Sequence, residues 1–252
     1  MPQSRPGSQR IDFIIAGVQK AGTTALFDYL SDAPDVALSR EKETHFFDDD
    51  SRDWARPDYG DYHALFDAPD GRPRGEATPI YLYWPNSLER IRAYNPKVRL
   101  VVLLRDPVAR AWSHWRMEYA RGFEKNPFAW CIRQGRMRLF ESEPWGFHRA
   151  FGYVERGFYG EQMERLLGLF PKDQLLVLRA EDLQADPGAV LAAVRRFLGL
   201  PANAGPVAAR QVHVGREMDY GSELTAEDTA FLRGLYARDQ ARLAALTGIS
   251  FF

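Results

Sequence analysis

Three short apolar runs, each followed by a segment of mixed polarity, organise the chain. The runs cover residues 11–16, 100–104 and 174–178, and their apolar residues are nearly continuous, as in strands buried on both faces of a sheet. Segments between the runs carry apolar residues at helical spacing. Because strands that alternate with helices favour a parallel sheet with right-handed crossovers, we predict an α/β fold of three layers, with a central parallel sheet flanked by helices.

Polar and proline residues predict where the helices begin. We expect helices over residues 25–30 and 160–170, and another that starts at Pro187. Four polar residues are predicted to cap helices at their N-termini: Asn86, Asp106, Thr225 and Asp228. Residues 48–73 are rich in Asp, Arg, Gly and Pro, which predicts loops and one short helix near residues 62–66.

The composition indicates a globular chain without a strong electrostatic preference for a partner. The 252 residues are 45% hydrophobic, and 33 basic residues nearly balance 34 acidic ones, which disfavours nucleic acid as a partner. The single cysteine, Cys131, excludes a disulfide framework and a cysteine-based zinc site. We expect a disordered segment over residues 1–10, one domain over residues 11–252, no membrane span and a cytoplasmic location.

The segment that joins the first predicted strand to the first predicted helix has the layout of a phosphate-binding loop. Gly17 and Gly22 have the spacing of the G-x-x-x-x-G-K-[ST] motif, and Thr24 occupies its last position. Thr23 stands where that motif has lysine, and the lysine of the loop is Lys20. A γ-phosphoryl site needs the late lysine and a metal ion, whereas backbone N–H groups at a helix N-terminus can hold a smaller anion. The loop therefore predicts a P-loop-like fold that binds a different anion.

Two motifs together resemble those of sulfotransferases that use 3′-phosphoadenosine 5′-phosphosulfate (PAPS) as the sulfuryl donor. Residues 19–24 resemble the loop around the 5′-phosphosulfate, and residues 103–113 resemble the motif around the 3′-phosphate. Four further segments are similar to the heparan-type, or Golgi-type, branch: residues 43–47, 75–81, 156–159 and 214–216. The resemblance extends over roughly residues 11–250 and implies a soluble, bacterial-like member of the family. Ala77 departs from the lysine common in that branch, and the C-terminal cysteine pair of that branch is absent from this chain.

The resemblance implies a role for each matching residue. The residues expected to bind PAPS and its desulfated product, PAP, are Gln19, Lys20, Ala21, Gly22, Thr23, Thr24, Arg105, Ser113, Gly215 and Arg216. Lys20 is expected to stabilise the leaving phosphate, and Glu43 to act as the general base in an in-line transfer to an acceptor hydroxyl. His45 and Glu76 are alternative bases, since a histidine has a suitable pKa and Glu76 lies in a matching segment.

The sequence leaves several alternatives open. The chain is compatible with a P-loop-type nucleotide or small-molecule kinase, and with a non-catalytic module that binds PAPS or PAP. The acceptor is a carbohydrate, a lipid or a small natural product, and neither O- versus N-sulfation nor the oligomeric state is indicated. The many aromatic residues between 126 and 152 suit a lid, an acceptor surface or the core. No metal ion is expected, and the acidic runs 41–43 and 48–50 are interpreted as solvated faces.

Overall fold

A computed structural model describes residues 10–67, 70–202 and 218–252, and the chain divides into two compact units. The first unit is built from residues up to Leu104 and from a segment that begins at Gly168. The second unit contains Arg105–Leu167 and the C-terminal segment. The expected single domain stays a prediction, and the expected disordered segment lies outside the described residues except for Arg10.

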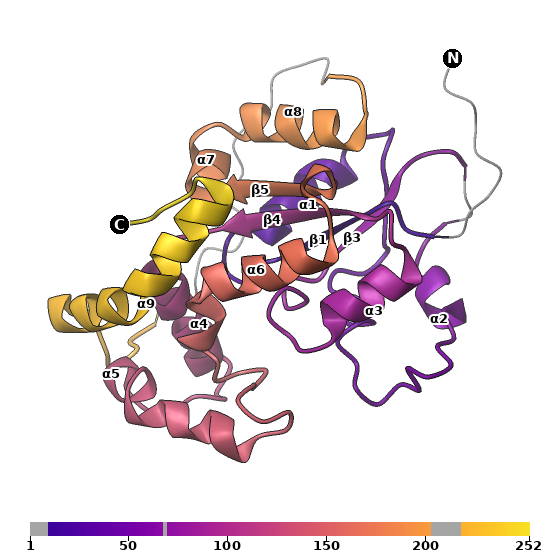
Figure 1. The fold of residues 1–252 in the computed structure, drawn as a ribbon. Coiled ribbons are helices and arrows are strands. Elements are labelled where there is room, and N and C mark those ends of the chain that lie inside the picture. Colours follow the sequence, from indigo (N-terminus) through magenta and orange to yellow (C-terminus); the bar gives the residue numbers. More distant parts are fainter. Residues whose placement is uncertain (1–9, 68–69, 203–217) are drawn as a thin grey trace. The chain divides into compact units, whose positions relative to one another are not determined.

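The first unit contains a five-stranded sheet in the order β2-β3-β1-β4-β5, and Figure 1 labels four of these strands. All four pairs of neighbouring strands are parallel, which confirms the predicted sheet. The strands are β1 (Phe13–Gly17), β2 (Ala37–Leu38), β3 (Arg74–Ala77), β4 (Arg99–Leu104) and β5 (Leu175–Arg179). The three predicted apolar runs correspond to β1, β4 and β5, whereas β2 and β3 were not predicted.

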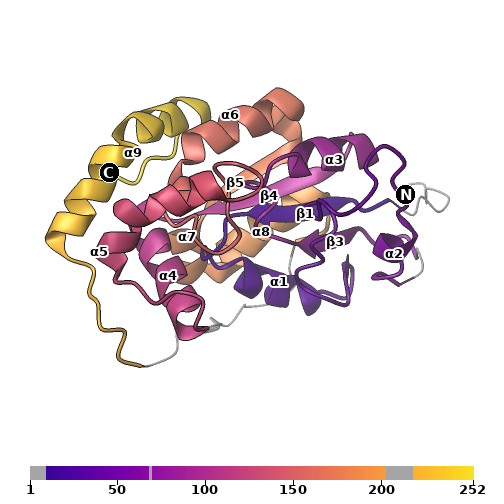
Figure 2. The ribbon, with the colours of Figure 1, turned by 90° about the horizontal axis from the view of Figure 1, so that it is seen from below.

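Helices cover both faces of this sheet. The helices of the first unit are α1 (Thr23–Ser31), α2 (Gly60–His63), α3 (Ser87–Tyr94), α7 (Ala180–Ala185) and α8 (Pro187–Leu198), with a 3-10 turn, η3 (Lys172–Gln174). Figure 2 shows α1 and α3 on opposite faces of the sheet. Right-handed crossovers place α1 and α3 on opposite faces, because the chain moves from β1 to β2 in one direction along the sheet and from β3 to β4 in the other. Helix α8 contacts both α1 and β5, so it lies in the same layer as α1. With α3 on the other face, the sheet is the middle of three layers, as predicted.

The sheet has no room for a side chain at Gly75, which lies between buried strands. β1 and β4 consist almost entirely of fully buried apolar residues, as their continuous runs predicted. Phe13 on β1 pairs in register with Gly75 on β3, and a Cβ atom at Gly75 would lie 2.2 Å from the Phe13 ring. The ring therefore occupies the space that a side chain at residue 75 would need.

All four predicted residues lie at helix N-termini, but only three of them make capping hydrogen bonds. Asp106 accepts a hydrogen bond from the backbone N–H of Ala109 at 2.8 Å, ahead of a proline at the first helical position. Thr225 and Asp228 form a reciprocal capping box. Asn86 precedes α3 as predicted, but its side chain makes no capping hydrogen bond. The reason is its left-handed backbone, φ 62°, since a capping residue needs an extended conformation.

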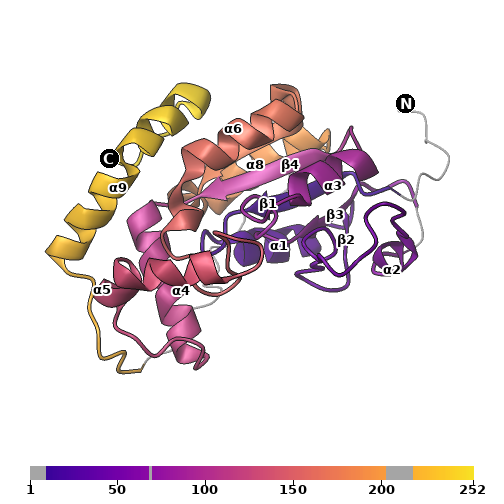
Figure 3. The same ribbon diagram turned by 60° about the horizontal axis from the view of Figure 1, so that its bottom comes forward.

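The second unit is helical, and its core is aromatic. Its elements are α4 (Pro107–Ala120), α5 (Phe128–Cys131), two 3-10 helices, η1 (Gln134–Glu141) and η2 (Glu155–Gly157), most of α6 (Tyr159–Leu169), and α9 (Ala226–Thr247). Helices α4, α5 and α9 share one buried cluster, and Figure 3 shows the three of them. The aromatic residues between 126 and 152 are divided, since Phe128 is fully buried and Trp145 is 69% exposed.

Candidate functional site

The loop between β1 and α1 has a backbone suited to an anion. Lys20 and Gly22 both adopt left-handed conformations, with φ of 73° and 88°. Successive turns of this kind make successive backbone N–H groups converge on one concavity. Gly22 is the N-cap of α1, so no side chain caps the helix, and its first turn carries no acidic residue. The N–H groups and the dipole of α1 therefore favour a negatively charged ligand at this loop.

The structure brings the predicted residues of this loop together. Gln19, Lys20 and Thr24 are half-buried, and Ala21 and Thr23 are buried. The loop is attached to the sheet because the N–H of Val18 donates to the carbonyl of Leu103 on β4 at 2.8 Å. A site at the carboxyl end of β1 is where parallel α/β sheets place their ligands.

The segment that carries Glu43 and His45 forms a chain of ionic contacts. Nε2 of His45 lies 3.4 Å from Oε2 of Glu43, and Nδ1 of His45 lies 3.0 Å from a carboxylate oxygen of Asp48. The ammonium group of Lys42 lies 3.1 Å from Oε1 of Glu43. The interpretation of run 48–50 as a solvated face is therefore wrong for Asp48, whose side chain is fully buried and paired with His45.

These contacts set the charge state of both groups. Burial alone would raise the pKa of Glu43, but the His45 hydrogen bond and the charge of Lys42 outweigh it and lower that pKa to about 2. The hydrogen bonds to Asp48 and to Glu43 raise the pKa of His45 to about 9, against the effect of burial. At neutral pH His45 is therefore an imidazolium, which cannot accept a proton, and Glu43 is a carboxylate, which can.

Glu76, the third candidate base, is enclosed. It lies on β3, its exposed fraction is 0%, and its carboxylate accepts hydrogen bonds from the hydroxyls of Thr44, Tyr62 and Thr78 at 2.6–2.9 Å. Burial raises the pKa of Glu76, and these hydrogen bonds oppose the rise. Because no acceptor molecule can reach a fully covered carboxylate, this geometry argues against Glu76 as the base.

The expected 3′-phosphate residues belong to the second unit. Arg105 is the first residue after β4 and is half-buried, and Ser113 is a half-buried residue of α4. Gly215 and Arg216 lie outside the described residues.

Neither metal chemistry nor thiol chemistry is indicated by the described residues. Within residues 10–67, 70–202 and 218–252, no group of three or more His, Cys, Asp or Glu residues is placed to hold a metal ion. Cys131 is buried, and burial together with nearby Glu124 raises the pKa of its thiol to about 12. A thiol with so high a pKa is a poor nucleophile at neutral pH. No helix in the described part of the chain is both long enough and apolar enough to cross a membrane.

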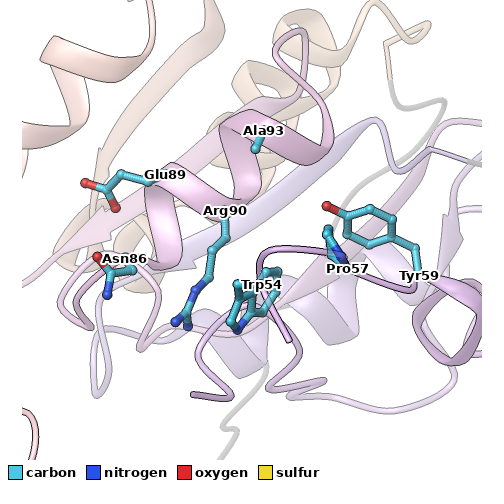
Figure 4. A pocket seen from close by; sticks show the side chains of 7 residues that line it. All are labelled: Trp54, Pro57, Tyr59, Asn86, Glu89, Arg90 and Ala93. Carbon is cyan, nitrogen blue, oxygen red and sulfur yellow. The ribbon is translucent and has the colours of Figure 1, made fainter. Parts of the chain in front are cut away.

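An open groove lies beside α3 and has a volume of about 320 Å³. Figure 4 shows the residues that line it: Trp54, Pro57, Tyr59, Asn86, Glu89, Arg90 and Ala93. The guanidinium of Arg90 lies 4.4 Å from the centre of the Trp54 ring and donates a hydrogen bond to the carbonyl of Phe47. A second groove shares Trp54 and Pro57 and extends to Phe46. Both grooves are therefore lined in part by residues 46–59, the stretch of chain that follows Glu43 and His45.

Comparison with known proteins fits this arrangement of sheet and loop. The family model described as "Sulfotransferase domain" matches residues 10–215. The chain belongs to the sulfotransferase domain family. A bacterial sulfotransferase from Alicyclobacillus acidocaldarius has a similar structure, with a TM-score of 0.79 and 27% sequence identity over 96% of this chain and 97% of that one. The predictions of the family and of its α/β fold are therefore confirmed.

Curated relatives fit the branch expected from the sequence. Human heparan sulfate glucosamine 3-O-sulfotransferase 6 is 34% identical over 200 residues, which is 78% of this chain and 55% of the relative. Human heparan sulfate glucosamine 3-O-sulfotransferase 3B1 is 33% identical over 78% of this chain and 48% of its own length. This sulfotransferase chain thus spans about half the length of those relatives. Mouse SULT7A1 complexed with PAP shares the fold, with a TM-score of 0.56 at 14% identity over 92% of this chain and 84% of that one.

Sequence reasoning missed the polar residues that surround the Glu43 segment. Asp48 was interpreted as solvated, and the hydroxyl partners of Glu76 were not considered as site residues. In the run of three aspartates at 48–50, Asp48 is fully buried and Asp50 is exposed, and nothing in the run itself distinguishes the two. One signal was available, because a histidine three residues before an aspartate can pair with it within a single turn.

Proposed function

We propose that this sulfotransferase transfers the sulfuryl group of PAPS to a hydroxyl of a carbohydrate acceptor and releases PAP. The observation that carries the proposal is the loop between β1 and α1, with two left-handed residues and an acid-free helix N-terminus. In the reaction the acceptor oxygen forms a bond to sulfur, and the bond from sulfur to the bridging phosphate oxygen breaks. The electron pair of that bond stays on the phosphate, and the acceptor proton passes to Glu43.

The donor is held by residues from both sequence motifs. The backbone N–H groups of the β1–α1 loop bind the phosphosulfate, and Lys20 stabilises the charge that develops on the bridging oxygen. Arg105 binds the 3′-phosphate, because a guanidinium fork matches a phosphate, and Ser113 adds a hydroxyl donor. Gly215 and Arg216 are proposed to contact the phosphosulfate as the family motif implies.

Glu43 serves as the base although its pKa is low. In a loose transition state the sulfuryl group is nearly free of both oxygens, and the acceptor hydroxyl loses its proton late. As the bond to sulfur forms, that proton becomes strongly acidic, so a carboxylate with a pKa of about 2 is able to accept it. The imidazolium of His45 holds the carboxylate ionised and oriented.

A carbohydrate acceptor is supported by the relatives and by the groove beside α3. The relatives named above are heparan sulfate glucosamine 3-O-sulfotransferases. Trp54 and Tyr59 line the groove with aromatic side chains that can pack against a sugar ring, while Asn86 and Glu89 offer polar groups to its hydroxyls. Ala77 replaces the lysine common in the heparan branch, so we propose an acceptor with less negative charge than heparan sulfate. The cytoplasmic location stays a prediction.

The test is an acceptor screen with ³⁵S-labelled PAPS, run on the wild type and on Glu43→Gln. The screen includes neutral and sulfated oligosaccharides, a lipid glycoside and a phenol. We expect labelled oligosaccharide from the wild type and about 10²- to 10⁴-fold slower turnover for Glu43→Gln, with unchanged PAP affinity by calorimetry. Glu41→Gln, at a neighbouring exposed carboxylate, is the matched control.

Each alternative function gives a distinct outcome. Transfer of ³²P from ATP with Mg²⁺ would establish a kinase and contradict the proposal. PAP binding without labelled product from any acceptor would favour a binding module. Transfer to the lipid or the phenol alone would retain the sulfotransferase chemistry and overturn the carbohydrate acceptor.

A further inference from the structure

Glu76 is a buried carboxylate surrounded by hydroxyl groups. Its Oε2 atom is 2.6 Å from the hydroxyl of Thr78 and 2.9 Å from that of Thr44. Its Oε1 atom is 2.8 Å from the hydroxyl of Tyr62 and 3.3 Å from that of Tyr81. A buried carboxylate needs such partners, because an uncompensated charge in the interior is costly. The function proposed above makes no direct use of Glu76.

Two of these hydroxyls also hold the backbone of the segment that carries Glu43 and His45. The N–H of Thr44 donates to the hydroxyl of Thr78 at 3.0 Å. The N–H groups of Phe46 and Phe47 donate to the hydroxyl of Tyr81 at 3.1 and 3.3 Å. Each of these two hydroxyls therefore accepts from the segment on one side and faces Glu76 on the other.

The direction of these hydrogen bonds depends on the carboxylate. The hydroxyls of Thr78 and Tyr81 donate to the carboxylate of Glu76 and keep their lone pairs for the backbone N–H groups; the Tyr81 hydroxyl also lies 3.0 Å from that of Thr44. The distance of 2.6 Å between Thr78 and Glu76 is typical of an O–H group that donates to a charged oxygen. A donor in place of Glu76 would compete with the backbone N–H groups for the same lone pairs.

The held positions lie on both sides of His45. Thr44 precedes it and Phe46 follows it, and His45 itself has a left-handed backbone, φ 51°. This conformation is uncommon for a non-glycine residue, although histidine adopts it more often than most, and it persists where the surroundings hold the backbone. The hydroxyls of Thr78 and Tyr81 hold the backbone N–H groups of Thr44 and Phe46, on either side of His45.

We propose that Glu76 is a positioning residue, which through Thr78 and Tyr81 fixes the backbone of residues 44–47 and so places Glu43 and His45 for the acceptor. The proposal rests on the proposed function in one respect only, the role of Glu43 as the base. Its structural part, the placement of His45 beside Glu43 and Asp48, holds independently of turnover.

The experiment compares Tyr81→Phe with Tyr62→Phe. Each variant removes one hydroxyl that donates to Glu76, but only Tyr81 also holds backbone N–H groups of the segment. For Tyr81→Phe we expect kcat to fall about 10²-fold with unchanged PAP affinity, since a misplacement of about 1 Å is enough for that loss. We also expect the pKa of His45, followed by NMR, to fall from about 9 towards its ordinary value of 6.5.

Tyr62→Phe is expected to lower the melting temperature about as much as Tyr81→Phe does, because each loses one hydroxyl that donates to Glu76. In Tyr62→Phe, however, kcat and the His45 titration should stay unchanged. Glu76→Gln is expected to give both effects of Tyr81→Phe, and Thr78→Val repeats the test at the other hydroxyl if either variant fails to fold. An unchanged His45 titration in Tyr81→Phe and Thr78→Val would overturn the positioning role. Suppose instead that the His45 titration is altered in Tyr81→Phe while Glu43→Gln keeps full turnover. That result would support the positioning role and overturn Glu43 as the base.

Discussion

Nε2 of His45 lies 3.4 Å from Oε2 of Glu43, and this contact joins two groups that the sequence offered as competitors for the same role. Each group stabilises the charged form of the other, so the pair consists of an imidazolium and a carboxylate at neutral pH. The proton acceptor and its partner are thereby distinguished by their surroundings rather than by residue type.

The pair predicts how stability depends on pH. The pKa of His45 is raised to about 9 from 6.5, so its contribution is complete below pH 6.5 and is lost as the pH rises through 9. The pKa of Glu43 is lowered to about 2 from 4.5, so its contribution is complete above pH 4.5 and is lost as the pH falls through 2. Urea unfolding should therefore show both contributions in full between pH 4.5 and 6.5.

His45→Ala should flatten the alkaline side of this profile. The variant lacks the group that titrates near pH 9, so its free energy of unfolding should change less than that of the wild type between pH 6.5 and 9. Identical slopes for the two proteins over that range would contradict the raised pKa of His45.

Lys20→Ala is expected to slow turnover by about 10²- to 10³-fold, because the leaving phosphate loses a cation positioned for its developing charge. Lys172→Ala, at an exposed lysine of η3, is the control and should retain wild-type turnover. Single-turnover rates with saturating PAPS give the measurement. Equal rates for both variants would remove Lys20 from the mechanism.

Arg105→Ala tests the proposed 3′-phosphate contact. A charged hydrogen bond contributes about 1.5–3 kcal/mol, so PAP should bind about 10- to 100-fold more weakly to the variant. Adenosine 5′-phosphate, which lacks the 3′-phosphate, should bind the variant and the wild type equally. Calorimetry with both nucleotides separates the outcomes, and equal losses for the two ligands would show that Arg105 acts elsewhere.

Trp54→Ala tests the groove beside α3 as a sugar-binding surface. The aromatic face contributes to acceptor binding and not to the donor, so we expect the KM for the oligosaccharide to rise while the affinity for PAP stays constant. Phe123→Ala, at an exposed aromatic residue outside segment 126–152, is the control. An unchanged acceptor KM in Trp54→Ala would place the acceptor on another surface.

Gly75→Ala tests the close contact between β3 and β1. The added methyl group would meet the Phe13 ring at 2.2 Å in a fully buried layer, and overpacking of this kind costs about 1–3 kcal/mol or more. Gly234→Ala is the matched control, because its Cβ would meet nothing within 4 Å and it lies in the interior of α9. That control should stabilise the protein by about 0.8–1 kcal/mol, as alanine does in exposed helices. Thermal unfolding of both variants gives the comparison.

The sequence predicted those elements whose signal is local. The strands β1, β4 and β5 follow from continuous apolar runs, and their observed ends differ from the predicted ones by at most two residues. Strand β3 was missed because it contains Arg74 and Glu76, and nothing near them in the sequence shows that both are buried. Their burial depends on partners elsewhere, such as Tyr62 for the carboxylate.

The candidate site likewise has one part that the sequence predicted and one part that it did not. The β1–α1 loop is encoded in consecutive residues, so its glycines and its lysine were recognisable as a motif. The surroundings of Glu43 depend on hydroxyls more than 30 residues further along the chain, such as Thr78 for the N–H of Thr44. Spacing within the sequence carries no information about such contacts, which only the folded sheet creates.

The single, buried cysteine of this chain makes it a convenient carrier for spectroscopic labels. Maleimide or nitroxide reagents require an accessible thiolate, and Cys131 offers neither access nor a low pKa. A thiol introduced at any exposed residue would therefore react alone, without prior removal of the native one. Pairs of such labels, one on each compact unit, would report distances with and without PAP against a silent background.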